Sequence, residues 1–120
     1  MEFGIRPGVL DEIRQLAVTY HIEKVILFGS RARGDYKRTS DIDLAVSGGD
    51  VVQFALAVDE ETSTLLMYDV VDLDGPVQDE LRQSIEREGI VIYEKYDNFC
   101  AALQNLKEIF SYEEPYNTVV

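Results

Sequence analysis

Apolar residues recur along the chain with two different spacings, which predict an alternation of helices and strands. Over residues 8–21 they lie three or four positions apart, as in an amphipathic helix, and Pro7 favours a helix start. A continuous apolar run at 24–28 ends in Gly29, as in a buried strand. The same patterns predict strands at 41–47, 67–73 and 90–93, and helices at 50–66, 77–88 and 96–112. The chain therefore has the order of an α/β fold, a sheet of about four strands flanked by helices.

Length and composition narrow the class of protein. The 120 residues suit one domain, and a hydrophobic content of 46% is ordinary for a soluble globular chain. No apolar run reaches the roughly 18 residues of a membrane span, and the N-terminus lacks the pattern of a signal peptide. The single cysteine, Cys100, excludes an internal disulfide. We therefore expect a cytoplasmic protein with no membrane partner.

The charge of the chain is large and uneven. A net charge of −12 repels phosphates and argues against direct nucleic-acid binding. Four of the eleven basic residues nevertheless fall within residues 31–38, namely Arg31, Arg33, Lys37 and Arg38. A basic loop inside an acidic protein suits a small polyanion, although Lys37 and Arg38 are equally consistent with solvated loop positions.

A turn and a pair of aspartates carry the candidate chemistry. Gly29 and Ser30 follow a buried strand, and Asp41 and Asp43 open the next one. Residues i and i+2 of a strand share a face, so these two carboxylates repel each other unless a cation lies between them. Hard oxygen ligands suit Mg²⁺, and a turn of free backbone N–H groups beside it suits a nucleoside triphosphate.

The motif resembles that of the nucleotidyltransferase superfamily related to DNA polymerase beta, and within it the minimal nucleotidyltransferase (MNT) domains. The resemblance covers roughly residues 8–94 and rests on the run Gly29-Ser30-x-Ala32-x-Gly34 followed by Ser40-Asp41-Ile42-Asp43-Leu44. It implies a polymerase beta-like fold with a mixed sheet. We expect a nucleotidyltransferase core at 1–95, followed at 96–120 by a helix and a tail that could dock a partner.

The resemblance also implies roles for individual residues. Gly29 and Ser30 would hold the β- and γ-phosphates of ATP. Arg31, Arg33 and Ser40 would complete the nucleotide-binding set. Asp41 and Asp43 would be catalytic residues that ligate two Mg²⁺ ions. The alternative is structural: Ser30 as a helix cap, Asp41 as a turn residue and Asp43 as a surface position, which leaves the basic loop unexplained.

The family needs a third catalytic, metal-binding carboxylate, and two aspartates compete for that role. Asp69 and Asp72 are three positions apart on one predicted strand, so only one of them can face Asp41 and Asp43. We favour Asp69, because the sequence around it fits the order of residues in relatives. Asp72 would then face away, to cap a turn or pair with a base.

The resemblance implies transfer of AMP from ATP to a hydroxyl. MNT domains of this size commonly pair with a helical HEPN ribonuclease toxin, and the implied acceptor is a tyrosine of that toxin. Two alternatives stay open: an antitoxin that acts by occlusion alone, and an aminoglycoside-type enzyme with a small-molecule acceptor. A homo- or hetero-oligomer is compatible with all three. The apolar stripe Phe99, Leu103, Leu106 and Phe110 either docks a partner or folds back onto the sheet.

Overall fold

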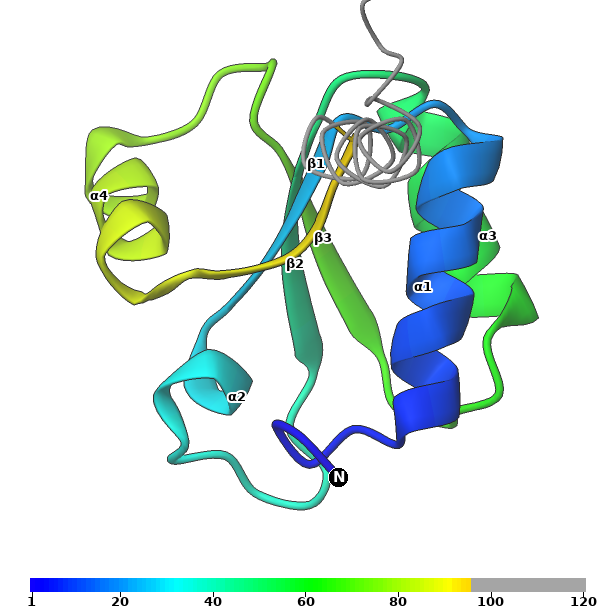
Figure 1. Cartoon of the computed structure of the whole chain (residues 1–120). Coiled ribbons are helices and arrows are strands. Elements are labelled where there is room, and N and C mark those ends of the chain that lie inside the picture. Colours follow the sequence, from blue (N-terminus) through cyan, green and yellow to red (C-terminus); the bar gives the residue numbers. More distant parts are fainter. Residues whose placement is uncertain (96–120) are drawn as a thin grey trace, which may run out of the picture.

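The computed structural model describes residues 1–95, which form a sheet with helices on both faces (Figure 1). The predicted helix at 96–112 and the tail at 113–120 lie outside the described residues, and the division of the chain at residue 95 stays a prediction. In chain order the elements are α1 (Pro7–Thr19), β1 (Lys24–Phe28), α2 (Ser30–Arg33), β2 (Ile42–Ser47), α3 (Val51–Glu61), β3 (Tyr68–Asp72), α4 (Asp79–Glu88) and β4 (Ile90–Glu94).

The four strands form one mixed sheet in the order β3-β2-β1-β4. β1 pairs antiparallel with both β2 and β4, whereas β2 and β3 are parallel. The predicted fold class, a mixed four-stranded sheet flanked by helices, is therefore confirmed. The parallel pairing matters most for the site, because it aligns the first residues of β2 with the first residues of β3.

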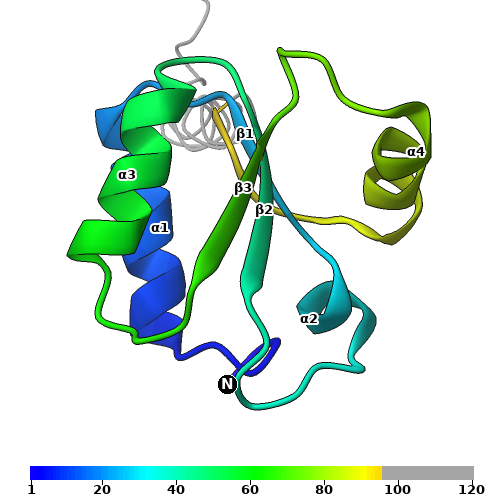
Figure 2. The same cartoon turned by 180° about the vertical axis from the view of Figure 1, so that it is seen from behind.

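Alternation along β2 decides which side chains face which helices. Ile42, Leu44 and Val46 are fully buried in the larger core, together with apolar residues of α1 and α3. Ala45 belongs to a second cluster with Phe28 and Ile85 of α4. Because neighbouring strand residues point to opposite faces, Asp43 lies on the same face as Ala45. Figure 2 shows α1 and α3 on one side of the sheet and α2 and α4 on the other.

The helix predicted at 50–66 ends at Glu61, five residues early. Asp50 caps its N-terminus by accepting a hydrogen bond from Gln53 N. At the other end Thr62 is extended, and its hydroxyl bonds the carbonyl of Val58 at 2.6 Å. The side chain thus takes up a helix-end carbonyl, an effect that periodicity cannot show. In the part of the chain that the structure describes, no helix is long and apolar enough to cross a membrane.

Candidate active site

Gly29 brings the chain from β1 directly against Asp43. Phe28 is the register partner of Asp43, and Gly29 follows at φ 75° and ψ −157°, a conformation open essentially to glycine alone. A Cβ at position 29 would collide with Oδ2 of Asp43. Gly29 therefore satisfies two demands, because both the backbone angle and the nearby carboxylate exclude a side chain.

Ser30 begins the short helix α2 and does not cap it. The N-cap is Gly29, and no side-chain hydrogen bond closes this helix terminus. The backbone carbonyl of Gly29 accepts from Ala32 N and Arg33 N, which fixes the tight turn. The partly exposed Ser30 thus lies at the start of α2, directly after the glycine that approaches Asp43.

Asp43 and Asp69 stand opposite each other across the parallel pair β2·β3. Register partners in a sheet carry their side chains on the same face, so both lie on the side of α2 and α4. Asp41, two residues before Asp43, is exposed and immediately precedes β2. The structure therefore places Asp41 and Asp69 near enough to Asp43 for their charges to act on it.

The pKa of Asp43 reflects the negative charges of the neighbouring aspartates. Burial, and then the charges of Asp69 and Asp41, raise the pKa of Asp43 to about 6. The positive charges of Arg33 and Arg31 act in the opposite direction. A half-buried carboxylate beside two others is a position that gains from a cation.

Asp72 lies at the other end of β3. Its register partner is Val46, near the end of β2, and its Oδ1 accepts a hydrogen bond from Asp74 N at 2.9 Å. Asp72 therefore stabilises the turn that follows β3, which is the capping alternative raised by the sequence. Of the two candidates for a third carboxylate, only Asp69 is aligned with Asp43.

The three carboxylates are suitable ligands for a divalent cation, but their side chains are too far apart in this structure to bind one together. Their oxygens are the hard ligands that Mg²⁺ prefers, and Asp43 lies in excess negative charge. Among residues 1–95, however, no three acidic, histidine or cysteine side chains are close enough together to hold a metal ion. Binding of Mg²⁺ at Asp41, Asp43 and Asp69 would therefore have to draw these side chains together.

Arg31 has a different role from the predicted one. It is 1% exposed and donates five hydrogen bonds, all to backbone carbonyls, with two of them to Ser40 at 3.0 and 2.9 Å. The other acceptors belong to Phe3, Gly4 and Arg38, and the guanidinium lies 5.0 Å from the ring centroid of Tyr36. This corrects the expectation of direct nucleotide binding, because the donors of Arg31 are already engaged. Arg31 ties the N-terminal segment to the loop that leads into Asp41.

Arg31→Lys is expected to lower the free energy of unfolding by about 3 kcal/mol, because an ammonium cannot satisfy carbonyls held by a planar five-donor fork. Urea denaturation followed by circular dichroism measures the effect. Arg87→Lys is the matched control at a largely exposed arginine, and should change stability by less than about 0.5 kcal/mol. Equal stability of the two variants would contradict the role given to Arg31.

Arg33 and Ser40, two other predicted nucleotide-binding residues, make contacts within the protein. Arg33 lies at the surface and pairs with Asp35 at 3.2 Å and Glu88 at 3.1 Å, which raises its pKa. Its charge still reaches Asp43, so it belongs to the electrostatic surroundings of the site. Ser40 accepts a hydrogen bond from Lys37 N through its hydroxyl at 2.8 Å, and its carbonyl holds Arg31. Ser40 therefore shapes the loop before Asp41.

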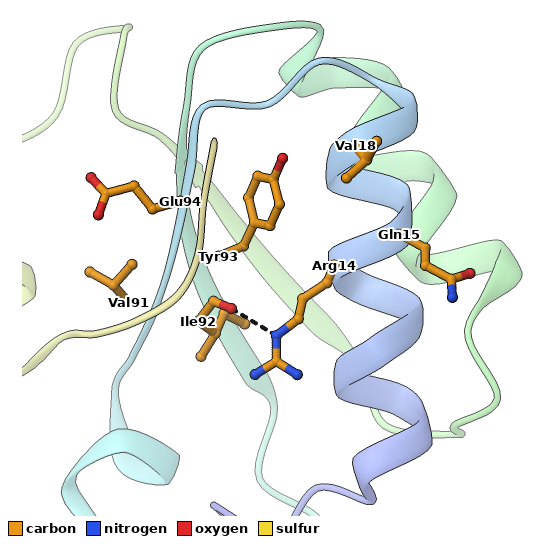
Figure 3. A pocket seen from close by; sticks show the side chains of 7 residues that line it. All are labelled: Arg14, Gln15, Val18, Val91, Ile92, Tyr93 and Glu94. Carbon is orange, nitrogen blue, oxygen red and sulfur yellow. Dashed lines mark hydrogen bonds between the residues drawn. The ribbon is translucent and has the colours of Figure 1, made fainter. Parts of the chain in front are cut away.

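A separate hollow of about 350 Å³ lies between α1 and β4 (Figure 3). Arg14 crosses from α1 and donates to the carbonyl of Ile92 at 2.8 Å. The lining of the hollow contains none of the residues that the sequence singled out. It consists of Arg14, Gln15, Val18, Val91, Ile92, Tyr93 and Glu94. The candidate chemistry is therefore at the start of β2 and β3, and not in this hollow.

Comparison with known proteins agrees with the site. Residues 11–98 match the family model described as polymerase beta, nucleotidyltransferase. The chain belongs to this family. The predicted resemblance to the nucleotidyltransferases related to polymerase beta is thus confirmed. Over 50 residues it is 52% identical to a Methanocaldococcus jannaschii protein whose name proposes a protein adenylyltransferase. That alignment covers 42% of this chain and 48% of the relative, so it spans about half of the relative's length.

Solved structures share the fold at low sequence identity. A toxin–antitoxin crystal structure with AMP-PNP has a TM-score of 0.55 at 22% identity, covering 92% of this chain and 93% of the other. A MntA–HepT toxin–antitoxin structure gives 0.56 at 16% identity, with 95% and 94% covered. A Shewanella oneidensis structure gives 0.52 at 15% identity, with 96% and 94% covered. At these identities the likeness shows the fold.

Proposed function

We propose that this nucleotidyltransferase is a Mg²⁺-dependent adenylyltransferase that moves AMP from ATP to a tyrosine hydroxyl of a HEPN ribonuclease toxin, and so acts as an antitoxin. The observation that carries the proposal is the alignment of Asp43 with Asp69 beside the side-chain-free turn at Gly29. Carboxylates on adjacent parallel strands next to an open turn suit a metal-assisted reaction on a triphosphate.

Each residue of the proposed centre has a distinct task. The absence of a side chain at Gly29 lets the backbone approach the triphosphate, and Ser30 adds a hydroxyl beside it. Asp41, Asp43 and Asp69 would hold two Mg²⁺ ions. When bound, these ions neutralise phosphate charge and lower the pKa of the attacking hydroxyl. Asp69 is also placed on the edge strand, where a carboxylate could take the proton of an acceptor.

ATP and a toxin partner are supported by the comparisons. One structural neighbour was crystallised with AMP-PNP, and the curated relative is named as an adenylyltransferase. Several neighbours are toxin–antitoxin pairs. The charge of −12 also favours a basic partner, such as the RNA-binding surface of a ribonuclease. An antitoxin that acts by occlusion alone is the second candidate, favoured by the same charge.

Radiolabel transfer tests the proposal. We expect ATP labelled at the α-phosphate, with Mg²⁺, to label the protein encoded by the neighbouring gene, whereas ATP labelled at the γ-phosphate leaves it unlabelled. EDTA and the double variant Asp41→Asn/Asp43→Asn should each reduce labelling at least 100-fold. Undiminished labelling by the double variant would contradict the proposal. Loss of labelling with full toxin neutralisation would favour occlusion.

A further inference from the structure

A groove of about 900 Å³ opens at the end of the sheet where β2 and β3 begin. Three segments line it: the N-terminal segment up to Val9, residues 38–39 before β2, and the loop at 62–67 between α3 and β3. Ile42 N donates to the carbonyl of Met67 at 2.8 Å, which joins the start of β2 to the residue before β3. The groove is thus built on the segments that lead into the candidate active site.

The groove lies next to the aspartates but outside the proposed triphosphate position. Thr39 and Met67 line it, and each is two residues before an aspartate of the centre, Asp41 or Asp69. Gly29 and Asp43, by contrast, lie on the sheet face of α2 and α4. Val9 of α1 and the loop after α3 contribute to the groove lining, and Gly29, Ser30 and the three aspartates do not. A molecule in the groove would therefore lie beside the proposed triphosphate position and not in it.

The lining has a chemistry unlike the rest of the chain. The chain has 23 acidic residues, yet among the described residues that line the groove there are two arginines, Arg6 and Arg38, and no aspartate or glutamate. The carboxylate of Glu12 contacts the lining, because it accepts hydrogen bonds from the backbone N and the hydroxyl of Ser63 on the side of Arg6. Leu65 is fully exposed and Met67 is 63% exposed. Exposed apolar side chains grouped beside positive charge are typical of a surface that a partner covers.

Within the proposed function, we infer that this groove docks the acceptor protein through a segment that carries an apolar side chain and carboxylates next to the accepting hydroxyl. The exposed Leu65 and Met67 would bury the apolar side chain, and Arg38 would face the carboxylates, because Arg6 already donates to the carbonyl of Ser63. Most of the basic surface of the toxin would then contact the acidic surface of this chain. One acidic segment of the toxin would bind in the groove. The proposal rests on the proposed function only for the identity of the reaction.

Peptide binding to the full chain without ATP tests the docking separately from the chemistry. The probe is a fluorescein-labelled peptide with one tyrosine flanked by leucine and glutamates, and its counterpart has lysines in place of the glutamates. We expect the acidic peptide to bind at least tenfold more tightly. Arg38→Glu and Leu65→Asp should each weaken its binding at least tenfold. Lys37→Glu is the matched control, an exposed neighbouring base outside the lining, and should change binding less than twofold.

The possible results separate the occupants of the groove. Equal binding of the two peptides, or an equal effect of Lys37→Glu and Arg38→Glu, would overturn the docking proposal. Tighter competition by a synthetic peptide of residues 108–116, an acidic and aromatic segment of this chain, would assign the groove to the chain's own tail and overturn it as well. Weaker binding of AMP-PNP to Arg38→Glu would assign it to the nucleotide instead. Failure of label transfer with intact, Arg38-dependent peptide binding would count against the reaction and leave the docking site supported.

Discussion

Gly29→Ala is expected to lower the free energy of unfolding by more than about 3 kcal/mol and to reduce nucleotidyl transfer at least 100-fold. Part of the loss is backbone strain of about 1–3 kcal/mol, because φ 75° and ψ −157° are open essentially to glycine alone. The rest arises because the new Cβ meets Oδ2 of Asp43 and must displace it. Thermal and urea unfolding give the first effect, and radiolabel transfer gives the second.

Gly34→Ala is the control that separates the effect of backbone strain from the effect of a collision with Asp43. Gly34 also has a positive φ, 97°, but a Cβ there has no atom within 4 Å among the described residues. We expect a loss of about 1–2 kcal/mol from strain alone, with transfer reduced less than threefold under conditions where the variant is folded. Equal losses of activity in the two variants would show that displacement of Asp43 is not what matters.

Asp43→Asn is expected to abolish transfer and at the same time to stabilise the fold at pH 8 by about 1 kcal/mol, or about 5 °C in Tm. The reason is the raised pKa of Asp43: its charged form is disfavoured by burial and then by Asp69 and Asp41. Asparagine keeps the shape and removes the charge. Differential scanning calorimetry in metal-free buffer measures the gain, and lower stability of Asp43→Asn at pH 8 would contradict this account.

The sign of the pH dependence follows from the same pKa. The pKa of the Asp43 carboxyl has its ordinary value of 3.8 in the unfolded chain and rises to about 6 in the folded protein, so between these pH values the folded state binds more protons. Its contribution to stability is therefore fully present below pH 4 and is lost as the pH rises through 6. The advantage of Asp43→Asn over the wild type should accordingly be near zero at pH 4 and complete above pH 7.

Several features of the fold could be predicted from residues alone. Uninterrupted apolar runs and Gly29 mark the buried strands, and strand parity places Asp41 and Asp43 on one side. Parity also shows that Asp69 and Asp72 cannot both face them. The resemblance favoured Asp69, but the physical reason, its alignment with Asp43, lies in the register of a parallel pairing, which forms between distant segments and leaves no local pattern.

Other features depend on contacts that a sequence does not display. Arg31 sits inside the motif and within a basic stretch, so it suggested an anion ligand, yet its guanidinium is used by carbonyls up to 28 residues away. Leu65 and Leu66 continue the apolar pattern of α3, yet the helix has already ended where Thr62 takes up the carbonyl of Val58. Ser63 is then held by the carboxylate of Glu12, whose pKa these hydrogen bonds lower. The bonds of Arg31 and Glu12 join segments far apart in the chain, whereas the bond of Thr62 is a local one that competes with continuation of the helix.

The most direct test of the account compares Asp69→Asn with Asp72→Asn in the α-phosphate transfer assay. The two aspartates share β3, but only Asp69 is aligned with Asp43, whereas Asp72 holds the turn at Asp74. The account predicts that Asp69→Asn loses transfer at least 100-fold with a stability close to that of the wild type. Asp72→Asn should keep transfer within about threefold and lose up to about 1 kcal/mol of stability. The opposite result, in which Asp72→Asn loses activity and Asp69→Asn keeps it, would contradict the proposed active site.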